Sequence, residues 1–373
     1  LLHKFNLELN NNFKIINYDY QSSGKIIQSK IVLKDAFKSS LIARSVKKIL
    51  FKEIQLEINL NKINKNSLII DGLYSTDELI YKKFKIKNNL DKKNKKFFVN
   101  FNISEKLFFN IINFQTDSGK ISNIKSEFSI KNNKFIFKLI DFTEGKNSIS
   151  IKKLILNNRN EIEGIDSVSV LTFDKRKENN NFKINFGEKI SILGEKYDSS
   201  NLLSLFSGDS KPNTLKNFTS AVEIKINTLI TKSQIPLRNL NLIGAIKKGK
   251  FNNISAKSEF SENQYLDISL KKSPNNKKIL EVYSDYPQAL LANYEFFEGI
   301  KGGKLLYNSI IDETESASKL TIENFKVDKA PAFATLLTLA DLGGIADLLS
   351  GEGMSFDFLE INLDDDSNTI VVE

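Results

Sequence analysis

The chain of 373 residues contains no cysteine and no tryptophan, and it has one methionine and one histidine. Without cysteine it can form no disulfide, no thiolate nucleophile and no cysteine-ligated metal site. His3, near the start of the sequence, is the single histidine, so neither a Ser-His-Asp relay nor a histidine-ligated metal is expected. These absences predict a protein without enzyme activity, cofactor or metal.

Arginine is also scarce, and lysine supplies nearly all of the basic charge behind the formal net charge of +9. Nucleic-acid-binding proteins usually concentrate basic residues on one face, often beside stacking aromatic residues. Here lysine is interspersed with asparagine and glutamate along the whole chain. We therefore expect no nucleic-acid partner and interpret the lysines as solvated surface, with an anionic membrane surface as the alternative.

No uninterrupted apolar run is long enough to cross a bilayer. The most apolar stretch, residues 330–353, contains Asp341, Asp347 and the Gly343-Gly344 pair. A carboxylate near the centre of a spanning helix is costly, and paired glycines weaken the helix between the two acids. The sequence also opens without a recognisable signal peptide, so we expect any membrane anchor of the intact protein to lie upstream of Leu1.

Residues 330–350 nevertheless have the period of amphipathic helices, and Pro331 suits a first helical turn. We expect a helix pair here, and we expect it to contain the longest helical element of the chain. Its predicted apolar face consists of Phe333, Leu336, Leu337, Ile345, Leu348 and Leu349. The pair could cover the end of a sheet or lie on a membrane; the absence of basic residues between Pro331 and Glu352 favours the cover.

Elsewhere, alternation of apolar and polar residues with a period of two dominates the sequence and predicts half-buried antiparallel strands. Polar residues such as Glu57 and Asn59 are expected on the face opposite the apolar ones. The apolar positions chosen as the candidate binding surface are Ile54, Leu56, Ile58, Leu60, Val99, Phe101, Val222, Ile224 and Ile226. The predicted fold class is mainly β, a long antiparallel sheet with a few short helices near the C-terminal end.

Two regions are expected, 1–210 and 211–373, because the segment SGDSKPNT at 207–214 is the best candidate boundary. The similar segments GKISNIKSEFS, from Gly119, and GKFNNISAKSEFS, from Gly249, each indicate a turn followed by a strand. They are explained by a repeated β-meander unit or by chance similarity in a biased composition. Short helices are predicted from Ser284 to Gly299 and, less distinctly, over 104–112.

Two blocks of sequence resemble the C-terminal module of the AsmA-like family of bacterial envelope proteins. The first, residues 323–363, contains the Ala330-Pro331 start, the LADLGGIADLLSGEG core and the strand entry at Phe356-Asp357. The second, residues 284–305, places a short helix before Gly302-Gly303 and a strand. Together they cover roughly residues 215–373, whereas residues 1–210 resemble the family only in their many strands. Asp341 departs from the pattern, because family members more often have a small residue there.

The resemblance implies a long sheet that curls into a groove with an apolar inner face and conducts phospholipid between the inner and outer membranes. It also implies a periplasmic location, attachment to the inner membrane and an outer-membrane partner protein. Alternation alone is equally compatible with a closed β-sandwich, because both architectures bury one face of each strand. A passive envelope scaffold and a β-sandwich module that binds a polar ligand such as a glycan are the alternative functions.

Overall fold

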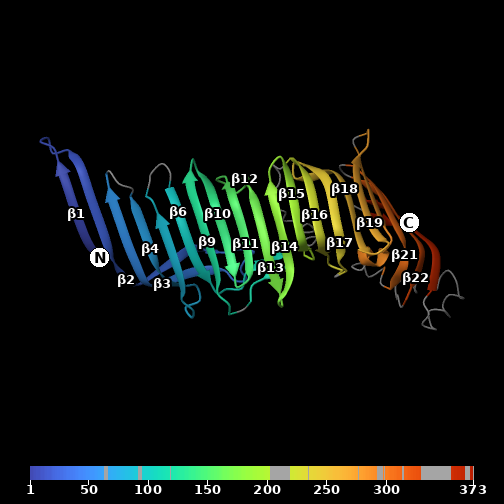
Figure 1. Cartoon of the computed structure of the whole chain (residues 1–373), viewed down its shortest axis with the longest axis horizontal. Coiled ribbons are helices and arrows are strands. Elements are labelled where there is room, and N and C mark those ends of the chain that lie inside the picture. Colours follow the sequence, from blue (N-terminus) through green and yellow to red (C-terminus); the bar gives the residue numbers. More distant parts are fainter. Residues whose placement is uncertain are drawn as a thin grey trace. The chain divides into compact units, whose positions relative to one another are not determined.

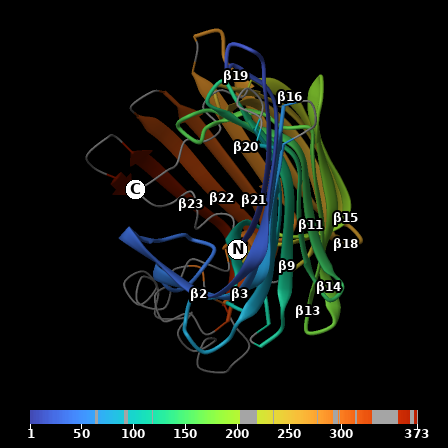
Figure 2. The same cartoon turned by 90° about the vertical axis from the view of Figure 1, so that its left-hand side faces the viewer.

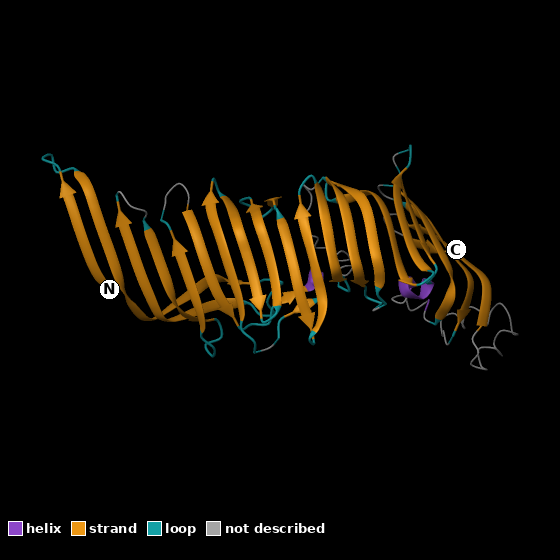
Figure 3. Cartoon of the chain, in the orientation of Figure 1, coloured by secondary structure: helices purple, strands orange, loops and turns teal. Residues whose placement is uncertain are grey.

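The computed structural model describes residues 1–62, 66–90, 95–117, 119–201, 219–233, 235–275, 277–291, 297, 299–312, 315–328, 354–365 and 370–372. Strands make up 74% of the protein and helix is almost absent (Figure 3). The prediction of a mainly β chain is therefore confirmed. The chain divides into two units, Leu1–Phe186 and Gly187–Glu373. The predicted boundary at residue 210 lies outside the described residues.

Unit 1 is a sheet in which nearly every strand pairs antiparallel with the next one along the chain (Figure 1). The order is β1-β2-β3-β4-β5-β6-β9-β10-β11-β13-β14, and the short β12 also pairs with β11. A separate pair, β7 and β8, flanks the 3-10 turn η1. The elements are β1 (Leu2–Leu9), β2 (Ile15–Phe37), β3 (Val46–Asn61), β4 (Ser67–Ser75), β5 (Lys82–Asn88), β6 (Lys95–Ile103), β7 (Phe108–Phe109), η1 (Asn110–Ile112), β8 (Phe114–Gln115), β9 (Ser122–Lys131), β10 (Lys134–Glu144), β11 (Asn147–Leu156), β12 (Ile162–Gly164), β13 (Ser167–Asp174) and β14 (Lys177–Phe186).

Tight turns explain why these strands follow one another so closely. Between β9 and β10, Asn132 and Asn133 both have positive φ, at 51° and 58°, while Lys131 pairs with Lys134. Two central residues with positive φ match the right-handed twist of the flanking strands, and asparagine tolerates that conformation. In Figure 2, strands β9, β11 and β14 of unit 1 form one layer.

Unit 2 has the strand order β15-β16-β17-β18-β19-β20-β21-β22-β23-β24. Gly249, with φ 75°, and Gly119 in unit 1, with φ 83°, both precede a strand, as the two similar segments predict. The elements are β15 (Lys189–Asp198), β16 (Ser220–Ile230), β17 (Leu237–Lys247), β18 (Lys250–Ser261), β19 (Gln264–Lys272), β20 (Lys278–Ser284), α1 (Pro287–Leu291), β21 (Ile300–Ile311), β22 (Ser316–Val327), β23 (Met354–Asp365) and β24 (Ile370–Val372).

The expectation of a purely antiparallel sheet is wrong at one pair of strands. β15 and β16 run parallel, with Ile192 beside Ile224. Parallel neighbours require a crossover connection rather than a tight turn, and residues 199–219 supply its length. The sheet is therefore mixed. That the sheet is built of repeats and curls into a groove stays a prediction.

Helix is confined to short segments among the described residues. α1 begins at Pro287, as predicted, because a missing N–H costs nothing in a first turn. The candidate over 104–112 is instead the strand β7 followed by the single 3-10 turn η1. The helix pair predicted over 330–350, with Phe333, Leu336, Leu337, Ile345, Leu348 and Leu349, lies outside the described residues.

Gly299 provides a first test of the fold. Its φ is 87°, and a Cβ built there would lie 1.9 Å from the carbonyl oxygen of Asp328. Gly299→Ala should therefore combine left-handed strain of about 1–2 kcal/mol with overpacking of about 1–3 kcal/mol. Gly302→Ala is the matched control, because Gly302 has φ 66° but nothing within 4 Å of a Cβ. Equal losses of unfolding free energy in urea for the two variants would contradict the close approach.

Candidate functional site

In unit 1 the strand register aligns apolar side chains into a row that crosses the sheet. Directly opposed residues of antiparallel strands point to the same face, so the pairing fixes which side chains are neighbours. With strands about 4.8 Å apart, a row across nine strands is about 40 Å long. The first row of unit 1 runs through Leu56 (β3), Ile70 (β4), Ile86 (β5), Val99 (β6), Ser126 (β9), Ile140 (β10), Ile151 (β11), Val168 (β13) and Ile184 (β14).

Ser126 is the one polar member of this row, and its hydroxyl donates to the carbonyl of Leu139 at 3.1 Å. The strand backbone therefore satisfies it, and the row stays apolar. A second row lies beside the first and contains Phe84, Phe101, Ile124, Phe142, Ile149, Val170 and Phe182. We call the surface formed by these two rows, with Ile58 and Leu60, the apolar face of unit 1.

Phenylalanine is concentrated on this face. The rings of Phe84 and Phe101 stack with centroids 6.0 Å apart, and Tyr74 meets both of them edge-on. Further along, Phe97 stacks on Phe128 at 5.0 Å. Large rings supply much apolar area for each residue. The 28 phenylalanines of the sequence thus serve in part to keep the rows continuous.

Much of the apolar face is only half-buried, although Phe84, Phe142, Val170 and Phe182 of the second row are buried. Leu56, Ile70, Ile86, Val99 and Phe101 are only half-buried, although they lie in the middle of a broad sheet. Over the described part of unit 1, the only other sheet is the two-stranded β7–β8 pair. Contiguous exposed apolar surfaces are rare in monomeric soluble proteins and usually mark interaction sites.

The opposite face of unit 1 is polar. The amide of Asn123 donates to the side-chain oxygens of Asn100 and Asn102 at 2.6 and 2.7 Å. Lys138 pairs with Glu127 at 3.0 Å. In β6 and β9, which alternate regularly, the polar side chains thus lie opposite the apolar face, as the alternation predicts.

One end of the apolar face is covered by the connection between β6 and β9, residues 104–117, which we call the cover segment. The ring of Phe109 lies 5.0 Å from that of Phe142, and Phe114 is nearly fully buried. The amide of Asn180 on β14 donates to the carbonyl of Ile112 at 2.7 Å. The cover segment therefore covers the face near Phe142 and Asn180.

Charged residues hold the cover segment in place. The ammonium of Lys82 is fully buried and lies 2.8 and 2.9 Å from the two carboxylate oxygens of Glu105. Arg44 contacts Glu105 at 3.0 Å and Asp77 at 3.4 Å. Arg44 follows the bridge between Ile42 and Leu107, which joins the β2–β3 connection to the cover segment.

This cluster shifts three pKa values. Burial opposes ionisation of Glu105, but hydrogen bonds from Lys82 and Thr76 outweigh it and lower the pKa of Glu105 to about 2. Burial, reinforced by the nearby Glu105 charge, raises the pKa of Tyr74. For Asp77, the effect of burial is overcome by backbone donors at Ile80 and Leu79 and the hydroxyl of Ser75, so its pKa falls well below the usual range. The two cations and two carboxylates balance one another, which is typical of a structural ion cluster.

Unit 2 also carries an apolar row across nine strands. Several members are half-buried, and Ala256 and Leu320 are buried. The row runs through Ile192 (β15), Ile224 (β16), Leu242 (β17), Ala256 (β18), Ile268 (β19), Val282 (β20), Tyr307 (β21), Leu320 (β22) and Ile361 (β23). With the neighbouring Val222 and Ile226, it defines the apolar face of unit 2.

A short helix covers one end of this face, as the cover segment does in unit 1. Ala289 of α1 packs with Leu237, Phe260 and Leu266. Leu291 belongs to a second buried cluster around Ile322. Packing against the sheet explains why a helix of five residues forms, since so short a helix is unstable alone.

The structure places all nine candidate strand residues on these faces. Ile58 and Leu60 flank Leu56 on β3, and Ile54 is buried beside a bulge at Glu53, whose φ is 53°. Val99 and Phe101 belong to the two rows of unit 1, and the β16 residues to unit 2. In unit 1 the candidate list omitted the contributions of β4, β5, β9, β10, β11, β13 and β14. In β10 a register shift between Phe137 and Leu139 breaks the alternation that could have revealed its contribution.

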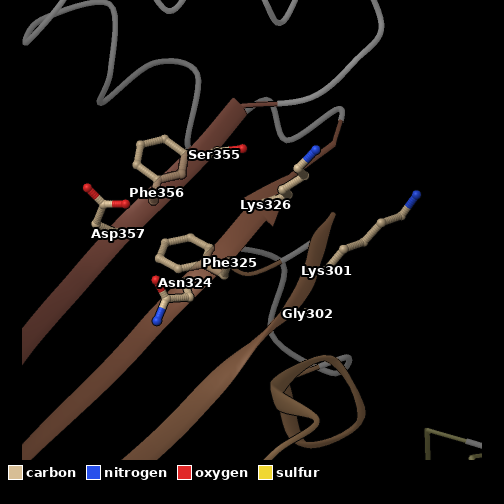
Figure 4. A pocket seen from close by; sticks show the side chains of 8 residues that line it. All are labelled: Lys301, Gly302, Asn324, Phe325, Lys326, Ser355, Phe356 and Asp357. Carbon is tan, nitrogen blue, oxygen red and sulfur yellow. The ribbon is translucent and has the colours of Figure 1, made fainter.

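A pocket of about 450 Å³ lies at the ends of β21, β22 and β23 (Figure 4). It has space because Gly302, opposite Phe325, has no side chain. The rings of Phe325 and Phe356 stack 5.2 Å apart, and the lysine side chains point away from them. Lys301 is paired with Asp328. The pocket thus combines a stacked aromatic pair with charges that are partly neutralised.

Two negative findings concern the described residues. No helix among them is long and apolar enough to cross a membrane. They contain no group of three or more His, Cys, Asp or Glu side chains that could hold a metal ion. In comparisons with known proteins, no protein-family model, curated protein or solved structure matches this chain.

Proposed function

We propose that this protein binds phospholipid along the apolar faces of its sheet and carries it between the inner and outer membranes of a bacterial envelope, without catalysis. The observation that carries the proposal is that each unit has an apolar row that crosses nine strands. The resemblance of residues 215–373 to the AsmA-like family supports the envelope setting and a partner in the outer membrane.

The physical mechanism is sliding rather than chemistry. Each methylene of an acyl chain that leaves water contributes about 0.8 kcal/mol, so a continuous apolar row holds two acyl chains strongly at any position along it. Movement between equivalent positions replaces one apolar contact by another. The head group remains in water beside the sheet. Direction is then set by the membranes and partners at the two ends.

A sandwich that binds a polar ligand fits the described residues less well. A sandwich needs a second sheet against the apolar face, and among the described residues the only additional sheet is the two-stranded β7–β8 pair of unit 1. Native mass spectrometry of the purified chain separates the functions. Co-purified phospholipid is expected for a carrier, and its absence is expected for a passive scaffold or a glycan-binding module.

Site-specific crosslinking tests which face holds the lipid. A photoreactive side chain at Leu56 or Ile58 should capture phospholipid in cells, because these residues lie on the half-buried apolar face. The same probe at Glu57 or Asn59 should capture little, because both are exposed on the opposite face. The four positions are consecutive residues of β3, so they differ mainly in the face on which their side chains lie. Equal capture at all four would contradict a one-faced binding surface.

A further inference from the structure

The strand ends on one side of unit 1 carry a series of basic side chains. Because neighbouring strands are antiparallel, β3, β5, β9 and β11 all end at this side of the sheet, the upper side in Figure 1. We call these four strand ends, with the strand beginnings beside them, the basic rim. Its basic side chains, all of them exposed, are Lys62, Lys95, Lys96, Lys131, Lys134 and Arg159.

Little negative charge balances the basic rim. The acidic residues that the structure describes at these strand ends are Glu161 and Glu163, and Glu163 is paired with Lys134. The whole unit shares this imbalance. Residues 1–186 contain 34 Lys and Arg against 19 Asp and Glu, a formal net charge of +15, whereas residues 187–373 contain 20 against 26, a net charge of −6. A surface with one sign of charge concentrates ligands of the opposite sign, so the basic rim favours an anionic ligand.

The basic rim adjoins the apolar face of unit 1. In β6, Lys95 and Phe97 have the same alternation as Val99, and Lys95 lies opposite Ile130 of β9, so all of them lie on the apolar face. Val99, in the first row, is four residues from Lys95, about 13 Å along the strand. An acyl chain in one leaflet spans half of a hydrocarbon core of about 30 Å, which is about 15 Å. A lipid whose acyl chains cover Phe97 and Val99 therefore has its head group beside Lys95.

The opposite rim differs in charge and in access. β6 ends there, and the cover segment that follows it packs over the apolar face near Phe142. The carboxylates of Glu105 and Asp77 at this rim are paired with Lys82 and Arg44. An anionic head group would meet a neutralised cluster there, beside a covered part of the face. The two rims are thus unequal as places for a head group.

We propose that the basic rim binds the phosphate of phospholipid head groups and makes the apolar face of unit 1 selective for anionic phospholipids. The acyl chains lie along the strands and point toward the cover segment. Every second strand ends at the basic rim, about 10 Å from the last, so a lipid that moves across the strands passes from one basic side chain to another. The inference rests on the proposed function, because it assigns the head-group side of the same lipid site.

A nucleic acid fits the basic rim less well. Proteins that bind single strands combine basic residues, often arginines, with aromatic rings on which successive bases stack. Arg159 is the one arginine among the six basic residues of the rim. Phe97 and Phe128, beside the rim, stack on each other with centroids 5.0 Å apart and do not stand apart as platforms for bases. The adjoining apolar face instead suits an anion that carries hydrocarbon.

Lipid capture by a photoreactive side chain at Val99 measures the selectivity of unit 1. The purified full chain is saturated from an equimolar mixture of phosphatidylglycerol and phosphatidylcholine with identical acyl chains, and mass spectrometry identifies the crosslinked lipids. Phosphatidylglycerol should be captured about fivefold more often, since one lysine beside an anionic surface contributes about that factor. Replacing three rim lysines together, Lys62→Gln, Lys95→Gln and Lys131→Gln, should bring the ratio near one without lowering total capture.

The matched control removes three exposed lysines from the polar face, Lys83→Gln, Lys125→Gln and Lys183→Gln, and should keep the preference. Equal capture of both lipids by the unchanged chain overturns the inference and leaves the lipid site standing. So does a preference that the rim variant keeps, or one that the two variants lose equally. Capture of neither lipid overturns the proposed function together with this inference.

Soluble anions distinguish a lipid site from a general anion site. Inorganic phosphate should change the capture ratio no more than chloride at the same ionic strength, because it carries no acyl chain. A single-stranded oligonucleotide should not displace phosphatidylglycerol at about 0.15 M salt. A preference that phosphate abolishes and chloride does not, or displacement of the lipid by the oligonucleotide, assigns the basic rim to that anion and overturns the inference.

Discussion

The double variant Val99→Asp/Ile268→Asp should lose most of its phospholipid binding. Val99 and Ile268 are half-buried members of the apolar rows of units 1 and 2. A carboxylate in contact with hydrocarbon costs about 3 kcal/mol on insertion scales, which corresponds to about a hundredfold weaker binding at each face. Binding of a fluorescent phospholipid, together with the lipid retained in native mass spectra, measures the loss.

The control for this experiment uses the adjacent residues on the polar face. Asn100→Asp/Ser269→Asp adds the same two charges on the same strands, but away from the rows. Its lipid binding should match that of the unchanged chain. Unfolding curves of both variants are needed, because a charge on a half-buried position also lowers stability. Equal lipid binding by both well-folded variants would rule out the apolar faces as the lipid site.

Lys82→Met should give one of the largest losses of stability of any single substitution in unit 1. It removes the buried ammonium that neutralises Glu105, whose side chain is 14% exposed. Breaking one partner of a buried ion pair costs about 3–5 kcal/mol because the other charge remains buried. Lys138→Met is the control, since its pair with Glu127 is exposed and should contribute at most about 1 kcal/mol. Urea unfolding at neutral pH compares the two, and similar losses would contradict a buried pair.

The same pair predicts an acid-sensitive stability. The folded-state pKa of Glu105 is lowered from 4.5 to about 2, so its contribution is present above pH 4.5 and is lost as the pH falls toward 2. The loss amounts to about 3 kcal/mol over that window. We expect Glu105→Gln to be less stable than the unchanged chain at neutral pH and to lose less unfolding free energy on acidification. An unchanged dependence of unfolding free energy on pH in this variant would contradict the lowered pKa.

The faces of individual strands could be predicted because alternation is a local property. In β3, Leu56 and Ile58 alternate with Glu57 and Asn59, and this order alone decides which side chains share a face. The start of α1 at Pro287 is similarly local, because it depends on the backbone of one turn. Turn residues such as Asn132 and Asn133 also act through their own φ angles.

The tertiary structure decided which strands are neighbours and in what register. In β4, Ile69 and Ile70 are both apolar, and only the pairing of Ile70 with Leu56 assigns it to the row. β15 and β16 pair in parallel, so hydrogen bonds within the sheet bring them together and no local turn does.

The same holds for the covering of the apolar faces. Lys82 and Glu105 are 23 residues apart, and Asn180 contacts Ile112 across 68. Such contacts depend on the arrangement of the strands in the sheet. Residues so far apart in the sequence meet only after the strands between them have paired. The sequence by itself thus determined the two faces of regularly alternating strands such as β3, whereas the folded chain assigned the faces of β4 and β10, aligned the strands into rows and covered one end.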